Sequence, residues 1–222
     1  MKQATQTKKN DTPTESVDAK VEVFFDRKIH EETLNQIKKA KDSIYICMAW
    51  IRHDDYKKAI LEAKDRGVNT IEINVTYVDE EKEKKSSKSI TDKTDDFIEK
   101  NININIIRKE KGGKMQDMHN KYCVIDEKIV ITGSFNWSFQ AANYNFENIV
   151  VIESPKIAEK FKKQFFNIKK YAIPLQKGES IYEKYKEMIN DIMQKLLSEK
   201  EISDTSEEMK KKASSITKKL FK

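Results

Sequence analysis

The feature that most constrains the fold is a near-continuous apolar run, SIYICMAWI, at Ser43–Ile51. A strand buried on both faces reads in this way, whereas a strand with one wet face alternates apolar and polar residues. The run is followed by an amphipathic helix pattern at Asp54–Asp65, closed by Gly67, and by a second apolar strand at Thr70–Val78. This order of strand, helix and strand predicts an α/β protein whose sheet is covered by helices.

The other periodic segments extend this sheet. They predict strands at Val21–Asp26, Ile102–Ile107, His119–Asp126, Lys128–Thr132 and Phe146–Glu153, and helices at Ile29–Lys41, Asp92–Glu99 and onward from Ser154–Pro155. The last helix carries one apolar stripe, formed by Ile157, Phe161, Phe165 and Ile168. The predicted fold class is therefore α/β, with a mixed, largely parallel β-sheet flanked by helices and a C-terminal helical extension.

The sequence divides into three parts. Residues 1–20 are polar and without periodicity, which predicts a disordered arm. Residues 21–173 form the folded domain. Residues 174–222 are a charged helical tail, in which apolar residues from Tyr182 to Leu196 step by three and four. That spacing fits a short coiled coil, and it fits equally well a helix that packs back on the domain.

The chain of 222 residues has a formal net charge of +6, which favours an acidic partner such as nucleic acid or an anionic surface. No apolar run is long enough to span a membrane, and the N-terminus lacks the apolar stretch of a signal peptide. We therefore expect a cytoplasmic protein. Its two cysteines, Cys47 and Cys123, lie in apolar runs and form no zinc pattern, so we expect both to be buried.

The stretch that carries chemistry is HNKYCVIDEKIVITGSFN, from His119 to Asn136. It reads H-x-K, four residues, D, six residues and G-S-x-N. Residues two apart share one face of a strand, so His119 and Lys121 are expected to point together. An imidazole is a competent nucleophile toward phosphorus and needs a cation beside it to receive a phosphodiester anion. Gly133 lets the backbone approach the phosphate, while Ser134 and Asn136 offer hydrogen-bond donors.

This pattern resembles the signature motif of the phospholipase D superfamily. The longer run ITGSFNWSFQAANYNFENIVV, at Ile131–Val151, is similar to the branch with a single motif. That branch includes small bacterial nonspecific nucleases and the mitochondrial cardiolipin hydrolase and piRNA nuclease group. The resemblance covers about Val21 to Ala172 and implies the phospholipase D-like α/β/α sandwich. It also implies that Glu147 orients the nucleophilic His119 and that Asp126 has a structural or outer-shell role.

The implied mechanism has two steps and needs no metal or other cofactor. His119 attacks phosphorus and forms a phosphohistidine; a second histidine protonates the leaving oxygen and then activates water. The chain has three histidines, and neither His30 nor His53 begins an H-x-K motif. One chain therefore holds half a site, and the resemblance implies a homodimer that shares one. His30 and His53 read as polar residues beside helices, with a substrate contact by His53 as the alternative.

Further substrate contacts are expected from the basic loop Arg108–Met118, which contains Arg108, Lys111 and Lys114. Trp137 either packs in the core or stacks on a base at the rim of the site. The leading function is a metal-independent endonuclease acting on DNA or RNA. The alternatives are a lipid hydrolase of the phospholipase D or cardiolipin type and a catalytically silent nucleic-acid-binding module.

Overall fold

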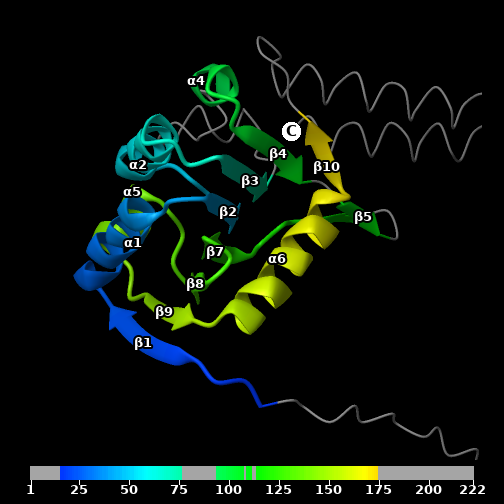
Figure 1. The fold of residues 1–222 in the computed structure, drawn as a ribbon. Coiled ribbons are helices and arrows are strands. Elements are labelled where there is room, and N and C mark those ends of the chain that lie inside the picture. Colours follow the sequence, from blue (N-terminus) through cyan, green and yellow to red (C-terminus); the bar gives the residue numbers. More distant parts are fainter. Residues whose placement is uncertain (1–15, 77–93, 108, 112–113, 175–222) are drawn as a thin grey trace, which may run out of the picture.

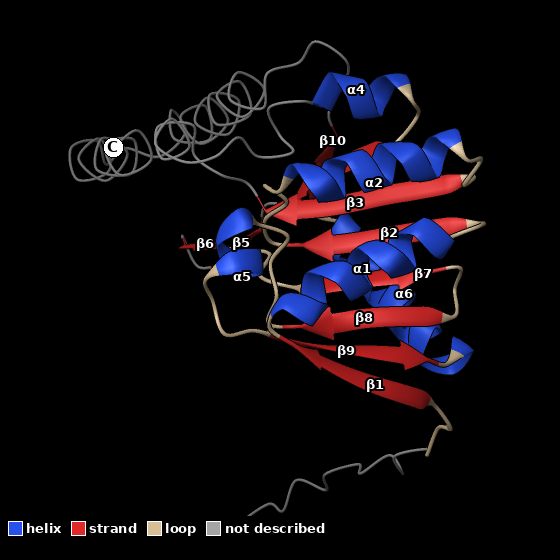
Figure 2. Ribbon diagram, turned by 90° about the vertical axis from the view of Figure 1, so that its left-hand side faces the viewer, coloured by secondary structure: helices blue, strands red, loops and turns tan. Residues whose placement is uncertain are grey.

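The structure is a computed structural model that describes residues 16–76, 94–107, 109–111 and 114–174. Its main sheet has eight strands in the order β1-β9-β8-β7-β2-β3-β4-β10, and a separate hairpin pairs β5 with β6 (Figures 1 and 2). The strands are β1 (Lys20–Phe25), β2 (Ser43–Met48), β3 (Thr70–Thr76), β4 (Asn103–Ile107), β5 (Lys109–Lys111), β6 (Lys114–Gln116), β7 (Lys121–Ile125), β8 (Ile129–Gly133), β9 (Asn148–Glu153) and β10 (Ala172–Pro174). The helices are α1 (Arg27–Lys39), α2 (Asp54–Asp65), α4 (Thr94–Glu99), α5 (Phe139–Asn143) and α6 (Pro155–Lys169).

Helices cover both faces of the sheet, as predicted. In Figure 1, α1 and α2 lie against one face and α6 against the other. The side chains of β2 explain its apolar sequence: Ile44, Ile46 and Met48 belong to the core under α1 and α2, whereas Tyr45 and Cys47 belong to the core under α6. Both cysteines are buried. The α6 stripe also packs as predicted, with Phe165 fully buried at its centre.

The sheet is mixed, but its expected largely parallel character is wrong. Within the described ranges, only the β2–β3 and β3–β4 pairs are parallel, and the other pairs in the main sheet are antiparallel. The physical reason is visible between β7 and β8. Asp126 and Glu127 both have a positive φ, of 50° and 54°, and the Lys128 N–H donates to the Ile125 carbonyl at 3.0 Å, which makes a tight turn. Such a turn reverses the chain and forces antiparallel pairing.

Two local expectations need correction. The predicted basic loop is interrupted by a hairpin in which Lys111 and Lys114 are Cα partners. Ser154 precedes α6 as predicted, and its hydroxyl donates to the Asp18 carbonyl at 3.1 Å. Lys20 is already paired with Glu153 in β1–β9, so the last residues of the predicted arm belong to the folded unit. The remainder of the arm and the tail beyond Pro174 lie outside the described residues, and the coiled coil stays a prediction.

None of the helices in the described ranges combines the length and hydropathy that a membrane span requires.

The two neighbouring phenylalanines of α6 provide a test of the packing. Phe165 is 0% exposed and Phe166 is 39% exposed. We expect Phe165→Ala to lower the free energy of unfolding by about 3–5 kcal/mol, because it removes a buried ring and leaves a cavity. The matched variant Phe166→Ala is expected to cost less than about 1.5 kcal/mol. Urea denaturation measures both, and equal losses would contradict this placement of α6.

Candidate active site

His119 and Lys121 come together at the start of β7. Lys121 is the first residue of the strand, and the exposed His119 lies two residues before it. The Lys121 amine lies 3.2 Å from Nδ1 and 3.4 Å from Nε2 of His119, and it donates to the His119 carbonyl at 2.9 Å. Burial lowers the pKa of Lys121, and the nearby Glu147 carboxylate partly offsets this effect. An exposed imidazole and a lysine amine are therefore adjacent at the start of β7.

Ser134 and Glu147 form the next part of the site. The Ser134 hydroxyl donates to Glu147, and the Asn145 amide donates to the other Glu147 oxygen at 3.2 Å. Within the described residues, the hydrogen bonds of Glu147 go to these two residues and not to His119. The hydrogen bond from His119 to Glu147 that the resemblance implies is therefore not among the described contacts of this chain. The Ser134 backbone N–H is also engaged, since it donates to the Asn148 carbonyl at 3.1 Å.

The structure shows why a glycine is needed at position 133. A Cβ at this position would lie 2.1 Å from the Asn148 carbonyl oxygen and 2.8 Å from the Ile149 Cα. Only glycine therefore lets β8 and β9 pair this closely beside Ser134. The expected role, close approach of a phosphate, is replaced by close approach of the neighbouring strand.

The loop that follows β8 is locked onto the segment after β2. The Trp137 carbonyl accepts from the backbone N–H groups of Arg52 (2.7 Å) and His53 (3.0 Å), and the Trp137 N–H donates to the Trp50 carbonyl at 3.1 Å. Asn136 is carried on this loop, and its side-chain oxygen is buried with no hydrogen-bond partner among the described residues. The loop thus holds the Asn136 amide at a position set by the sheet.

Of the two alternatives for Trp137, core packing or stacking on a base, the structure shows core packing. Its side chain is 1% exposed and stacks on Tyr56, with ring centroids 4.7 Å apart. A ring with no accessible face is unable to stack on a base.

Two residues near His119 were missed by the sequence reasoning. Trp50 meets the His119 ring edge-to-face at 5.7 Å, and the Arg52 guanidinium lies 5.7 Å from the centre of the Trp50 ring. The sequence predicts a single strand over Ser43–Ile51, but β2 ends at Met48, and Trp50 follows it next to His119. The polar sequence RHDD at Arg52–Asp55 could have indicated that this segment lies at the site, because residues just after a strand often contribute to functional sites.

Asp126 lies at the far end of β7, so an outer-shell role at the site is wrong. Its carboxylate accepts from the backbone N–H groups of Lys41, Asp42 and Ser43 at 2.8–3.1 Å. The five residues of β7 place it roughly 17 Å from the start of the strand at Lys121. Asp126 is structural and ties the β7–β8 turn to the start of β2.

The remaining predicted contacts stay predictions. Arg108 lies outside the described residues, and for Lys111 and Lys114 the structure describes the backbone only.

His30 and His53 lie side by side. His30 bonds to the Tyr56 hydroxyl (2.9 Å) and to Asp55 (3.1 Å), and its ring centre lies 4.8 Å from that of His53. Burial lowers the pKa of His53. Among the interactions of the described residues, neither histidine contacts His119.

Comparison with known proteins identifies the family. The family model "Cardiolipin synthase, PLD-like domain" matches residues 33–169, more than half of the chain. The chain belongs to the phospholipase D-like family. It is 30% identical over 132 residues to a mitochondrial cardiolipin hydrolase of Chlamydomonas reinhardtii, and this match covers 60% of the chain and 53% of the relative. The chain therefore spans about half the length of that curated relative.

Two solved structures share the fold of this phospholipase D-like chain. NucT from Helicobacter pylori superposes with a TM-score of 0.63 at 23% identity, covering 71% of this chain and all of NucT. Nuc, a phospholipase D family member from Salmonella typhimurium, gives a TM-score of 0.60 at 24% identity, covering 72% of this chain and 99% of Nuc. At these identities the likeness establishes the fold, a mixed open sheet flanked by helices.

The environment of Gly133 yields a stability prediction. We expect Gly133→Ala to lower the free energy of unfolding by about 1–3 kcal/mol, because the new methyl group meets backbone that has no room to yield. Gly67→Ala is the matched control, since a Cβ there meets nothing within 4 Å and only its φ of 97° is unfavourable. Chemical denaturation compares the two, and a smaller loss at Gly133 than at Gly67 would contradict the clash.

Proposed function

We propose that this protein is a metal-independent phosphodiesterase, and specifically an endonuclease that hydrolyses DNA or RNA. The observation that carries the proposal is the exposed His119 ring within 3.2 Å of the Lys121 amine. An accessible imidazole supplies the nucleophile, and the adjacent ammonium stabilises the phosphodiester anion and the charge that develops during attack. Membership in the phospholipase D-like family supports the same reaction class.

The proposed reaction proceeds in two displacements. A ring nitrogen of His119 attacks phosphorus, an N–P bond forms, and the bond from phosphorus to the leaving oxygen breaks. A second histidine donates the proton that the leaving oxygen needs. The same group then removes a proton from water, which attacks the phosphohistidine and releases the phosphate monoester and free His119. Lys121 holds the phosphoryl oxygens through both steps.

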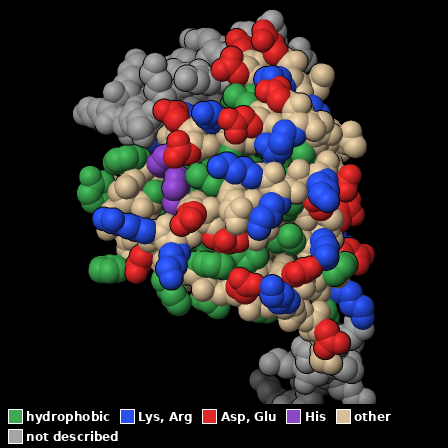
Figure 3. Space-filling view, turned by 60° about the vertical axis from the view of Figure 1, so that its left-hand side comes forward, with side chains coloured by type: hydrophobic (Ala, Val, Ile, Leu, Met, Phe, Trp, Pro, Cys, Tyr) green, Lys and Arg blue, Asp and Glu red, His purple; other side chains and the backbone are tan. Residues whose placement is uncertain are grey.

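We infer that the second histidine is His119 of another copy of this chain. Within the described residues, His30 and His53 contact each other and Asp55, and neither contacts His119. Apolar surface that suits a dimer interface lies close to Glu147: Phe139 is 53%, Tyr144 70% and Phe146 98% exposed. Figure 3 shows hydrophobic side chains beside histidine side chains on one face of the molecule. An isologous contact here brings the two His119 rings to one two-fold axis.

The substrate proposal rests on charge. A net charge of +6 and a pI near 9.0 favour a polyanion. The second candidate is a lipid phosphodiester. It is favoured by the same exposed aromatic side chains, which also suit an apolar membrane surface, and by the relative named as a cardiolipin hydrolase.

The deciding experiment incubates purified wild type and His119→Ala with labelled single- and double-stranded DNA and RNA, all in excess EDTA. We expect wild type to cut at least one substrate and His119→Ala to lose at least about a thousandfold in rate, because the covalent step is removed. Lys121→Ala is expected to lose activity as well, while Lys160→Ala, which removes an exposed charge on α6, keeps it. Release of headgroup from vesicles with intact nucleic acid would favour the lipid substrate. Salt-sensitive binding without turnover would indicate a silent module.

A mixing experiment tests the shared site. If each dimer holds one site built from both His119 rings, a mixed dimer with His119→Ala is inactive. After subunit exchange at equal amounts, the wild-type activity is expected to fall to about half, since about half of the wild-type subunits then lie in mixed dimers. An excess of the His119→Ala protein is expected to lower the wild-type activity further. Activity that is independent of added His119→Ala protein would contradict the shared site.

The pH dependence of the reaction tests the charge at Lys121. Burial lowers the pKa of this amine and the Glu147 carboxylate raises it, so Glu147→Gln is expected to lower the pKa further. The ammonium then loses its proton at lower pH, and the alkaline limb of the rate–pH profile moves to lower pH. Ser134→Ala is the control, because it keeps the carboxylate and is expected to lower the rate without moving the limb. If the alkaline limb of the rate–pH profile stays in place in Glu147→Gln, Lys121 is not the group whose deprotonation causes that limb.

A further inference from the structure

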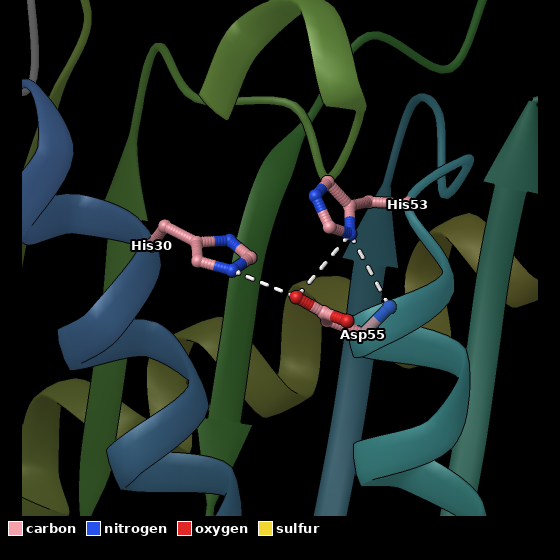
Figure 4. Close-up of side chains that lie close together, drawn as sticks. All are labelled: His30, His53 and Asp55. Carbon is pink, nitrogen blue, oxygen red and sulfur yellow. Dashed lines mark hydrogen bonds and ion pairs between the residues drawn. The ribbon is translucent and has the colours of Figure 1, made fainter. Parts of the chain in front are cut away.

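Two histidines and one carboxylate converge at the N-terminal end of α2. His30 projects from α1, His53 immediately precedes α2, and Asp55 lies in the first turn of α2 (Figure 4). One Asp55 oxygen lies 3.1 Å from Nε2 of His30 and 3.7 Å from Nδ1 of His53. One ligand atom from each residue falls within 4.8 Å of the other two.

These separations are close to those of a tetrahedral zinc site. Zinc binds imidazole nitrogen at about 2.0–2.1 Å and carboxylate oxygen at about 2.0–2.2 Å, which places neighbouring ligand atoms about 3.3–3.5 Å apart. The observed 3.1 and 3.7 Å bracket that value, and all three ligand atoms lie within 4.8 Å of one another. The two histidine rings need to approach each other for the cluster to enclose an ion. His53 is 15% and His30 25% exposed in the side chain, which leaves the open side of the cluster to water as a fourth ligand.

The rings are also held as zinc-binding histidines usually are. The nitrogen of His30 that faces away from Asp55 bonds to the Tyr56 hydroxyl at 2.9 Å. Tyr56 is fully buried and stacks on Trp137, so this partner is fixed. A hydrogen bond from the second ring nitrogen sets the tautomer and orientation of a metal-bound histidine. The His53 ring is stacked on Phe139 at 5.8 Å.

We propose that His30, His53 and Asp55 bind a divalent transition-metal ion of the zinc type, with water completing the coordination. Two neutral imidazoles and one carboxylate suit zinc better than calcium or magnesium, which prefer oxygen ligands only. The positive end of the α2 dipole opposes a cation, and the carboxylates of Asp54 and Asp55 in the first turn offset it. Without the ion, Nδ1 of His53 accepts from the Asp55 backbone N–H at 3.2 Å, and coordination replaces this helix cap.

The ion would be structural and separate from the chemistry at His119. It would link helix α1, which carries His30, to the start of helix α2, which carries Asp55. The His53 backbone N–H donates to the Trp137 carbonyl, one residue beyond Asn136. Fixing His53 therefore also braces the loop that carries Asn136.

Metal binding by the full chain tests this proposal without any assay of activity. Untagged protein, stripped with a chelator and exchanged into chelator-free buffer, is titrated with zinc chloride by calorimetry, and bound zinc is counted after gel filtration. We expect one zinc per wild-type chain and the same for His119→Ala, which removes the one histidine outside the cluster. Asp55→Asn and His30→Ala are expected to bind at least about tenfold more weakly, since each removes a ligand. Tyr56→Phe, which keeps the buried ring, is expected to lose about tenfold through the lost second-nitrogen contact.

A second readout is the thermal midpoint. Zinc is expected to raise it in wild type and His119→Ala, and to leave it unchanged in Asp55→Asn. Asp55→Asn keeps the size of the side chain and the backbone N–H, so it decides the matter if His30→Ala fails to fold. Absence of stoichiometric binding in wild type would make the cluster a hydrogen-bonded network only and overturn the proposal. Unchanged binding in both ligand variants would overturn it as well.

Discussion

The site depends on the antiparallel pairing of β2 with β7, in which Met48 lies opposite Lys121. The pairing continues past the strands, since the Ala49 N–H donates to the Asn120 carbonyl at 2.9 Å. Because the strands run in opposite directions, the end of β2 meets the start of β7 at one edge of the sheet. Trp50 is thereby brought against His119, although the two are far apart in sequence. A parallel pairing would place these residues at opposite edges.

The same edge receives the rest of the motif through two further antiparallel pairs. β7 pairs with β8 and β8 with β9, with Gly133 opposite Ile149. The β7–β8 turn sends the chain back to this edge, where β8 ends and β9 begins. Ser134, just after β8, therefore lies close to Glu147, just before β9. The missing side chain of Gly133 lets these two backbones close, and the Ser134–Glu147 hydrogen bond forms there. The motif residues thus include Gly133, which is needed for strand pairing, as well as polar side chains at the site.

The aromatic pair Tyr56–Trp137 connects the two polar clusters of the molecule. Trp137 anchors the loop after β8 beneath the segment that follows β2, and the Tyr56 hydroxyl holds His30. The loop that carries Asn136 and the proposed metal ligand His30 therefore share one rigid support. An exposed base-stacking Trp137 would have removed that support, which is a physical reason for its burial.

Residue patterns indicated the family and most of the longer helices and strands, but not α5, β10 or the β5–β6 hairpin. The apolar run at Ser43–Ile51 predicted a strand buried on both faces, and the H-x-K and G-S-x-N spacing predicted the phospholipase D-like family, because both depend on residues that are neighbours in the chain. Only the tertiary structure decided the direction of β7, the partners of Glu147, the burial of Trp137 and the meeting of His30 with His53. Those features depend on contacts between distant segments, which local periodicity does not encode. Asp126 shows the limit most plainly: it belongs to the motif by spacing, yet a strand's length carries it to the opposite edge of the sheet.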